Sequence, residues 1–154
     1  MAARASDRPR IRVAALMLLG GKVVLVRHRA GSSAYHLLPG GGVDYRETLE
    51  TALLREVSEE TGLEVSLGRP LFISDTIAPD GPRHVVNITF MADITGGSIT
   101  NAPEDPRVEA VDLVAPEDLG PLDLRPPMAD SIVRALKGGV VTTEYLGSLF
   151  TPER

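Results

Sequence analysis

Residues 39–63 read PGGGVDYRETLETALLREVSEETGL, and this stretch decides how the rest of the chain is interpreted. Three successive glycines, Gly40 to Gly42, precede a segment that favours a helix from near Glu47 to Gly62. Glycine often follows the last helical residue because it adopts a left-handed backbone at little cost. The stretch therefore predicts a glycine loop that leads directly into one helix.

This helix carries two kinds of side chain on one face. At about 100° per residue, Ala52 and Leu53 fall within about 60° of Leu49 and form an apolar stripe of the kind that packs on a core. Glu56 and Glu60 project along nearly the same line. The core-directed face is therefore apolar in its first half and carboxylate in its second half.

Three carboxylates are crowded near the end of this helix. Glu56 is three residues before Glu59 and four before Glu60, so the three side chains are neighbours. Like charges repel, and the C-terminal end of the helix dipole also disfavours anions. We expect a compensating positive charge, either Arg55 or, better, a hard divalent cation that takes several oxygen ligands. A solvated acidic face is the alternative, but the glycine loop favours a site, because its amides can approach a phosphate closely.

These residues resemble the Nudix box, G-x5-E-x7-R-E-U-x-E-E-x-G-U, in which U is a bulky aliphatic residue. The box covers 23 of 154 residues and every fixed position matches, namely Gly41, Glu47, Arg55, Glu56, Val57, Glu59, Glu60, Gly62 and Leu63. The resemblance implies a Nudix hydrolase with an α/β/α sandwich fold. The reaction it implies is attack of water on a phosphorus atom of a nucleoside diphosphate linked to another group.

The resemblance also implies roles for the box residues. Glu56 and Glu60 are expected to be metal ligands, and Glu59 is either a ligand or the base that accepts the proton of water. Arg55 orients the carboxylates, and Glu47 pairs with Arg55. The implied metal is Mg²⁺, with Mn²⁺ as an alternative.

A further acidic ligand in this family often comes from a loop before a late strand. Glu104, Asp105 and Glu109 are the candidates here, and Glu104 is our choice. Arg107 stands where relatives commonly carry a glutamate, so the chain departs from the family pattern at this position. If no loop acid serves, Glu59 becomes the better candidate for the base.

Substrate contacts are expected from two other parts of the chain. Gly40 and Gly41 offer close backbone approach to a phosphate. Arg27 and Arg29 lie at the end of an expected strand, where they either meet phosphate or are solvated. His36 stands three residues before Pro39, where many relatives place a tryptophan, and it either stacks on a base or is an ordinary surface histidine.

The expected substrate depends on a second resemblance, which is weaker than the match to the Nudix box. Pro79 lies 16 residues past Leu63, and a proline at about that place resembles the ADP-ribose-hydrolysing branch. ADP-ribose or another nucleoside diphosphate sugar is therefore the leading substrate, and a nucleoside triphosphate, as in MutT-like members, is the alternative. A domain that senses a nucleotide without cleaving it is disfavoured, because all three box glutamates are retained.

Composition limits the wider function. With a net charge of −5, no general attraction to nucleic acid or anionic membrane is expected. The partner that the Nudix resemblance implies is a small nucleotide. The chain has no cysteine, which excludes disulfides and thiol nucleophiles and suits a reducing cytoplasm. Dimers are common among Nudix relatives, so the resemblance also allows a homodimer.

The remaining pattern predicts an α+β fold, in which a mixed sheet is flanked by two helices. Residues 1–9 are expected to be a flexible tail and residues 10–154 a single domain. Two β-rich runs around Gly20 and Gly21 are expected to form a hairpin. The expected segments are strands at 10–19, 22–29, 35–38, 63–77, 84–94 and 108–114, a helical turn at 116–119, a helix at 126–137, and a strand or arm at 140–150.

Overall fold

The computed structural model describes residues 8–79, 81 and 83–152. In chain order its helices and strands are β1 (Arg10–Leu16), β2 (Leu18–Leu19), β3 (Lys22–Ala30), β4 (Ser33–Leu37), β5 (Gly40–Gly42), α1 (Leu49–Thr61), β6 (Leu63–Ile77), β7 (His84–Gly97), β8 (Val108–Val114), the 3₁₀ turn η2 (Pro116–Asp118), α2 (Ala129–Leu136) and β9 (Glu144–Ser148). None of the helices in these described ranges is long and apolar enough to cross a membrane. Of the expected N-terminal tail, only Arg8 and Pro9 lie within the described residues.

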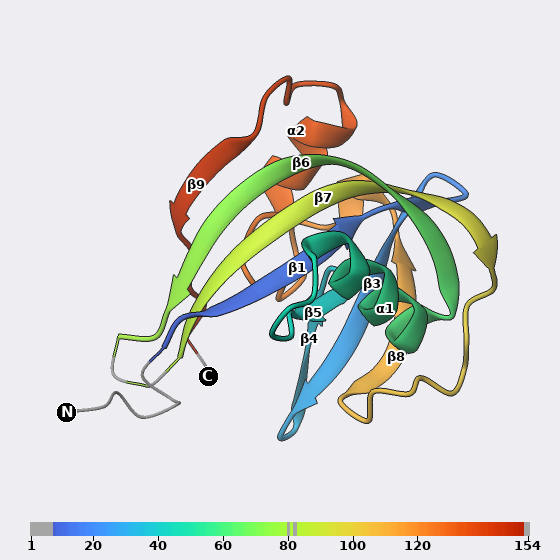
Figure 1. Cartoon of the computed structure of the whole chain (residues 1–154), viewed down its shortest axis with the longest axis horizontal. Helices are drawn as coiled ribbons and strands as arrows, with labels where there is room; N and C mark the ends of the chain where they lie inside the picture. Colours follow the sequence, from blue (N-terminus) through green and yellow to red (C-terminus); the bar gives the residue numbers. More distant parts are fainter. Residues whose placement is uncertain (1–7, 80, 82, 153–154) are drawn as a thin grey trace.

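Two sheets form the body of the fold (Figure 1). Five strands form the larger sheet in the order β5-β1-β7-β6-β9, and this sheet is mixed because β1–β7 and β6–β9 pair in parallel. In the second sheet β3 pairs with β8 and also with β2 and β4, all antiparallel. The long strands β6 and β7 are antiparallel neighbours and curve over α1 (Figure 1).

The two helices cover opposite faces of the larger sheet. Successive residues of a strand point to opposite faces, and β1 shows this alternation directly. Val13 packs in the same core cluster as Leu53 of α1, whereas Ala14 packs with Ile132 of α2. The fold is therefore α+β, with a mixed sheet between two helices, and the prediction of an α/β/α sandwich is confirmed.

Local sequence explains where α1 begins and ends. The Thr48 side chain accepts a hydrogen bond from the Thr51 backbone N–H at 3.0 Å, which caps the first turn. The helix ends at Gly62, whose φ of 78° is left-handed. The helix thus starts two residues later than expected and stops where expected.

The predicted hairpin between residues 10–19 and 22–29 is present at its Gly20–Gly21 turn, but its extension along residues 10–16 is wrong. Only the two residues of β2 pair with the start of β3, while β1 lies between β5 and β7 in the other sheet. The consecutive residues 13–17 are all buried, and a strand that is apolar on both faces belongs inside a covered sheet. A hairpin strand with one solvated face would instead alternate.

The structure also refines the predicted helix at 126–137 and the predicted strand or arm at 140–150. Helix α2 begins at Ala129 and not at residue 126, since Pro126 and Pro127 disfavour helical backbone in the residue before each of them. The segment 140–150 contains β9, which pairs in parallel with β6. The Leu149 N–H then donates to the Asp75 carbonyl at 2.7 Å, so the end of the chain is held beside the larger sheet.

Candidate functional site

The central acidic residue of the site is Glu60, near the end of α1. Its side chain is only 2% exposed, because the helix face that packs Leu53 and Val57 continues through Glu60. Its Oε1 accepts a hydrogen bond from the Gly40 N–H at 2.7 Å. The end of the helix is thereby joined to the glycine strand β5.

Arg55 links most of the other carboxylates. Its guanidinium donates from Nε and Nη2 to Glu47 at 2.8 Å each and from Nη1 to Glu56 at 2.8 Å. Glu59 lies 3.7 Å from the same Nη1, and the Gly42 carbonyl accepts from Nη2 at 3.3 Å. Hydrogen bonds from Arg55 lower the pKa of Glu47 to about 2, and Glu47 in turn raises the pKa of Arg55. The expected pairing of these two residues is present.

The glycines of β5 are required by close approach. A Cβ on Gly41 would overlap the Glu56 carboxylate, and a Cβ on Gly40 would overlap the backbone of Val13. A side chain at Gly40 would therefore disturb the pairing of β5 with β1, and one at Gly41 would displace the Glu56 carboxylate. These glycines therefore set the distance between the carboxylates and the sheet.

The environment of Glu60 makes its charge costly. The pKa of Glu60 is raised to about 7, mainly by burial and to a smaller extent by the charges of Glu56 and Asp105. The hydrogen bond from Gly40 and the positive charge of Arg12 oppose this shift but do not cancel it. A buried, partly uncompensated carboxylate is what a cation site requires.

The loop that was expected to supply a further ligand passes close to the end of α1. The Glu104 N–H donates to the Glu59 carbonyl at 3.0 Å, which fixes the loop backbone there. Asp105 is paired with Arg107 at 2.8 Å, and this pairing lowers the pKa of Asp105. Glu109 pairs with Arg29 on the second sheet. Glu104 as a metal ligand stays a prediction, and Asp105 is the loop acid whose charge acts on Glu60.

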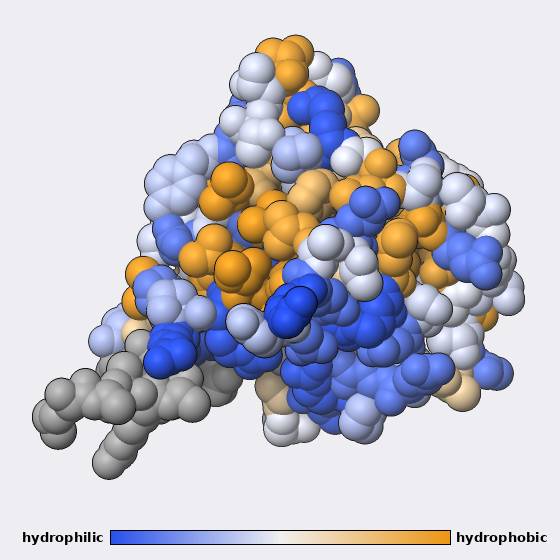
Figure 2. Space-filling model, viewed as in Figure 1, coloured by the Kyte–Doolittle hydropathy of each residue, from blue (hydrophilic) through white to orange (hydrophobic). Residues whose placement is uncertain are grey.

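The buried member of the carboxylate cluster, Glu60, faces a cleft with a cavity of about 460 Å³. Gly40, Gly41 and Glu60 line it. Five arginines line it as well, namely Arg8, Arg10, Arg12, Arg83 and Arg107. Figure 2 shows hydrophilic residues gathered over the part of the surface that contains α1 and β5. Arginine guanidinium groups bind phosphate oxygens strongly, so the cleft suits a polyanionic ligand.

None of these arginines was among the predicted substrate contacts. Arg8, Arg10 and Arg12 alternate along the chain, and side chains two residues apart on a strand share a face. That spacing was visible in the sequence and could have identified them. Arg83 and Arg107 come from the β6–β7 connection and from the loop before β8, and only the fold brings them to the cleft.

His28 also lines the cleft. Its Nε2 lies 4.0 Å from Glu60 Oε2 and, among the described residues, this buried atom has no hydrogen-bond partner. Its ring packs edge-on against Tyr35, with 5.5 Å between ring centroids. Burial, and then the charge of Arg107, lower the pKa of His28. The neutral form is therefore favoured.

The other predicted substrate contacts lie on the second sheet. Arg27 contacts Glu109 at 3.3 Å and Asp112 at 3.5 Å. Arg29 donates to Glu109, and His36 lies 2.8 Å from Asp112. None of Arg27, Arg29 and His36 is among the described residues that line the glutamate cleft. Their roles in substrate binding stay predictions, and Gly40 and Gly41 are the predicted contacts that the structure brings to the cleft.

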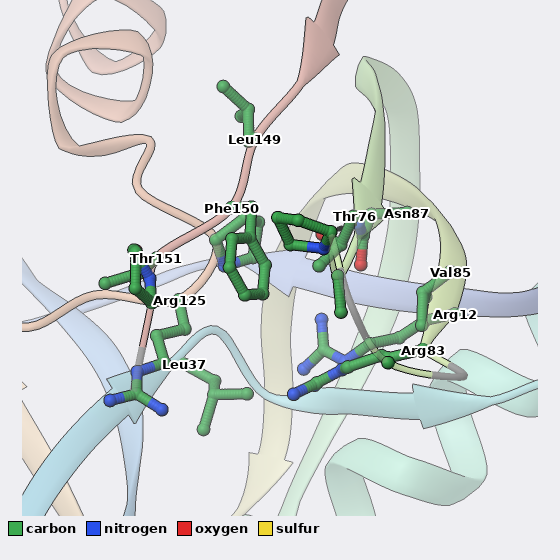
Figure 3. A pocket seen from close by; sticks show the side chains of 15 residues that line it. Arg12, Leu37, Thr76, Arg83, Val85, Asn87, Arg125, Leu149, Phe150 and Thr151 are labelled. Atoms are coloured by element: carbon green, nitrogen blue, oxygen red, sulfur yellow. Dashed lines mark hydrogen bonds between the residues drawn. The ribbon is translucent and has the colours of Figure 1, made fainter. Parts of the chain in front are cut away.

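A second, larger cavity of about 880 Å³ adjoins the cleft (Figure 3). Arg12, Leu37, Arg83 and Val85 line both cavities, so the two are neighbours. The C-terminal segment contributes Phe150 to the larger one.

The donor chemistry of the cluster fits a divalent cation. Four carboxylates, those of Asp44, Glu47, Glu56 and Glu59, lie within 4.0 Å of the single Arg55 guanidinium, and buried Glu60 is next to them on the helix. Hard cations such as Mg²⁺ take oxygen ligands of this kind. Within the described part of the chain, no three Asp, Glu or His side chains already converge on one point. Arg55 donates to Oε1 of Glu56, which leaves the second oxygen of this carboxylate for an ion.

This fold, with a glutamate-rich helix end set against a glycine strand, defines a class of protein that the comparisons identify. The NUDIX domain family matches residues 8–136, and the chain belongs to this family. A curated relative, the ADP-ribose pyrophosphatase of Methanocaldococcus jannaschii, is 30% identical over 106 residues, which are 68% of this chain and 63% of that protein. The match thus spans less than two thirds of the length of that relative.

Two solved structures add to this assignment. The MutT NUDIX hydrolase of Burkholderia pseudomallei is 30% identical, with a TM-score of 0.65, and the match covers 82% of this chain and 97% of that one. An ADP-ribose pyrophosphatase of Streptococcus suis is 23% identical, with a TM-score of 0.67, over 94% of this chain and 100% of that one. At that identity the second likeness supports the fold alone.

Proposed function

We propose that this protein is a Nudix pyrophosphohydrolase that uses Mg²⁺, with Mn²⁺ as an alternative, to cleave the diphosphate linkage of a nucleoside diphosphate derivative. The observation that carries the proposal is the position of Glu60. It is buried beside Glu56, and it lines a cleft to which five arginines also contribute. A buried carboxylate that a cation would neutralise and arginines that bind phosphate therefore line the same cleft.

The glutamates have two roles in this proposal: some bind the metal ion, and one accepts the proton of the attacking water. Glu56 and Glu60, with Glu59 or Glu104, would hold the ion. A bound divalent cation supplies positive charge to the phosphate oxygens and makes a water molecule more acidic. Glu59, whose side chain is 36% exposed, would accept the proton of the attacking water.

Arg55 and Glu47 act on the carboxylates and not on the substrate. The two hydrogen bonds between them fix the guanidinium plane, and the remaining Nη1 then orients Glu56. Gly40 and Gly41 allow the phosphate to approach the backbone next to these carboxylates. The cleft arginines would neutralise the phosphate oxygens that the ion does not contact.

ADP-ribose, or a related nucleoside diphosphate sugar, is the proposed substrate. The named activity of the Methanocaldococcus jannaschii relative supports this choice. Pro79, the residue that resembles the ADP-ribose branch, lines the larger cavity next to the cleft. A nucleoside triphosphate is the second candidate, because the MutT hydrolase of Burkholderia pseudomallei is equally similar in sequence.

Product analysis on a nucleotide panel tests this proposal. The panel holds ADP-ribose, other nucleoside diphosphate sugars, dinucleoside polyphosphates and nucleoside triphosphates, each with and without Mg²⁺. We expect metal-dependent release of AMP and ribose 5-phosphate from ADP-ribose. Pyrophosphate release from a triphosphate would keep the enzyme class and replace the substrate. Tight binding of one compound without turnover of any would identify a sensor and overturn the proposal.

The proposal extends to location and assembly. A small nucleotide substrate and the absence of cysteine suit a cytoplasmic enzyme. A homodimer is the proposed assembly, and a hydrophobic band beside the hydrophilic α1 surface is a surface it could use (Figure 2). Exposed residues of the larger sheet include Ile11, Ile73 and Ile77, at 36–45% exposure. Light scattering tests this assembly, and a mass equal to one chain at micromolar concentration would contradict it.

A further inference from the structure

The larger cavity has a different chemistry from the cleft that contains the glutamates. We propose that it holds the nucleoside monophosphate half of the substrate, with the base against Phe150 and the phosphate between Arg12 and Arg83. The proposal rests on the proposed function for the bond that reacts. It adds where the nucleoside lies and which residues select it.

The two arginines stand where the cavities meet. Arg12 and Arg83 line both of them, and Figure 3 shows the two side chains extending side by side into the same space. Arg12 is held there by a hydrogen bond from its Nη2 to the Leu38 carbonyl at 2.8 Å. A ligand that occupied both cavities would therefore lie against these two side chains.

The positive charges of Arg12 and Arg83, where the two cavities meet, favour binding of an anion. Burial is the main cause that lowers the pKa of Arg12, and Glu60 and Glu56 oppose it, whereas Arg83 lowers it further. Arginine keeps its proton in proteins, so two positive charges face each other. A diphosphate placed between them would remove this repulsion and provide bidentate hydrogen bonds.

The walls of the larger cavity suit a nucleobase. Phe150 provides an aromatic face, with apolar neighbours such as Leu37, Val85 and Leu149. Base–aromatic stacking is a common, sequence-tolerant source of affinity. A volume of about 880 Å³ lies in the usual range for a small-molecule site. The glutamate cleft, by contrast, is lined mostly by charged residues and glycines.

A buried amide supplies a directional group at the same place. Asn87 is 4% exposed, and its Nδ2 donates to Thr76 Oγ1 at 3.0 Å, which fixes the orientation of the amide. The carbonyl oxygen is then an acceptor suited to an exocyclic amino group such as that of adenine. Among the described residues that line this cavity there are three arginines and no carboxylate. An anionic nucleotide would therefore meet positive charge there and no repelling carboxylate of these residues.

Binding of the two product halves tests this assignment in the full chain. The probes are AMP and ribose 5-phosphate, measured by calorimetry with EDTA present so that catalysis cannot interfere. We expect Phe150→Leu, which keeps apolar volume and removes the aromatic face, to weaken AMP binding about tenfold and to leave ribose 5-phosphate binding unchanged. Arg83→Met should weaken AMP binding by about the same factor.

Lys22→Met is the matched control. It removes one positive charge at the exposed start of β3. Lys22 lines neither cavity, so AMP binding should not change. Thermal denaturation of each variant confirms folding, and Phe150→Tyr, which keeps an aromatic ring, should restore AMP affinity relative to Phe150→Leu.

The outcomes separate this proposal from the proposed function. Unchanged AMP binding in both Phe150→Leu and Arg83→Met would overturn the assignment, even if the enzyme hydrolyses ADP-ribose. Weakened AMP binding in a protein that hydrolyses nothing would support the nucleoside cavity and overturn the hydrolase. A loss of ribose 5-phosphate binding equal to that of AMP in Phe150→Leu would place the sugar, and not the base, against Phe150.

Discussion

Two clusters of charged residues in this protein have similar composition and different physical character. The α1 cluster contains Glu47, Arg55, Glu56, Glu59 and Glu60. The β3–β8 cluster contains Arg27, Arg29, His36, Glu109 and Asp112. The first sets several carboxylates around one arginine and buries Glu60 to 2% exposure. In the second, two arginines and a histidine pair with two carboxylates, and each of these carboxylate side chains is about one third exposed.

The difference shows that imbalance and burial, more than residue types, distinguish a candidate site. Charges in the β3–β8 cluster satisfy one another near water, and such pairs are worth about 0–1 kcal/mol. In the α1 cluster the anions outnumber their partners, and burial raises the pKa of Glu60 to about 7. Of the two clusters, only the α1 cluster has excess negative charge that a cation would neutralise. Substitutions in the two clusters should therefore have very different effects on activity and stability.

The largest effect is expected from Glu60→Gln. The amide keeps the shape but loses the charge that would hold the ion, and an ion that supplies several kcal/mol to the transition state corresponds to a loss of about 10³-fold in kcat/KM. Steady-state hydrolysis of ADP-ribose measures it. Glu109→Gln, the same change in the β3–β8 cluster, is the control and should stay within about twofold of the parent. Equal losses in both variants would erase the distinction between the clusters.

The next effect is on the stability of the metal-free protein. The pKa of Glu60 is raised in the folded state to about 7, so the folded protein binds more protons than the unfolded chain between about pH 4.5 and 7. The free energy of unfolding should therefore fall as pH rises through this window, by about 3 kcal/mol at most. Urea denaturation in EDTA at pH 4.5 and pH 8.5 measures this change.

The comparison with Glu60→Gln isolates the contribution of this one carboxyl to stability. The variant cannot gain the charge, so its stability should change less between the two pH values. Mg²⁺ should restore stability to the parent protein at the higher pH and have less effect on the variant. The same pH dependence in both proteins would show that Glu60 is not the titrating group.

A smaller loss is expected from Arg55→Lys. Lysine keeps the charge but cannot make the paired hydrogen bonds to Glu47 while also donating to Glu56. Removing a group that orients metal ligands typically costs about 10- to 100-fold, and kcat/KM should fall by that factor. Combining it with Glu47→Gln should add little, because both changes break the same contact. Fully additive losses would contradict a shared orienting role.

The smallest effects are expected in the β3–β8 cluster. Arg27→Met, Arg29→Met and His36→Gln each break an exposed or half-exposed pair, so stability should change by about 1 kcal/mol or less. The same variants test the prediction that these residues bind substrate. A rise in KM of about tenfold, which corresponds to 1.36 kcal/mol of lost binding, would add this cluster to the site.

The sequence predicted the parts of the site that lie within one helix. A phase of about 100° per residue was enough to place Glu56 and Glu60 on the buried face, and Gly62 marked the end of α1. The Nudix box carries this local information, and it led to the correct family and fold class. The roles of the box residues in catalysis stay predictions.

What the sequence did not predict depends on contacts between distant segments. Arg12 and Arg83 meet because β1 and β7 pair in parallel, and the predicted hairpin placed β1 elsewhere. Phe150 reaches the larger cavity because β9 pairs with β6, a connection that local periodicity does not encode. Arg27 and Arg29 stood out in the sequence as a cationic group, but their partners Glu109 and Asp112 lie about 80 residues further along.

The most direct test of the account is the rate of ADP-ribose hydrolysis as a function of Mg²⁺ concentration, measured side by side for the parent protein and Glu60→Gln. We predict a saturable, metal-dependent release of AMP and ribose 5-phosphate from the parent protein and a rate about 10³-fold lower from the variant. Turnover that is independent of Mg²⁺, or equal in the two proteins, would contradict the claim that the α1 cluster is a metal-dependent catalytic site.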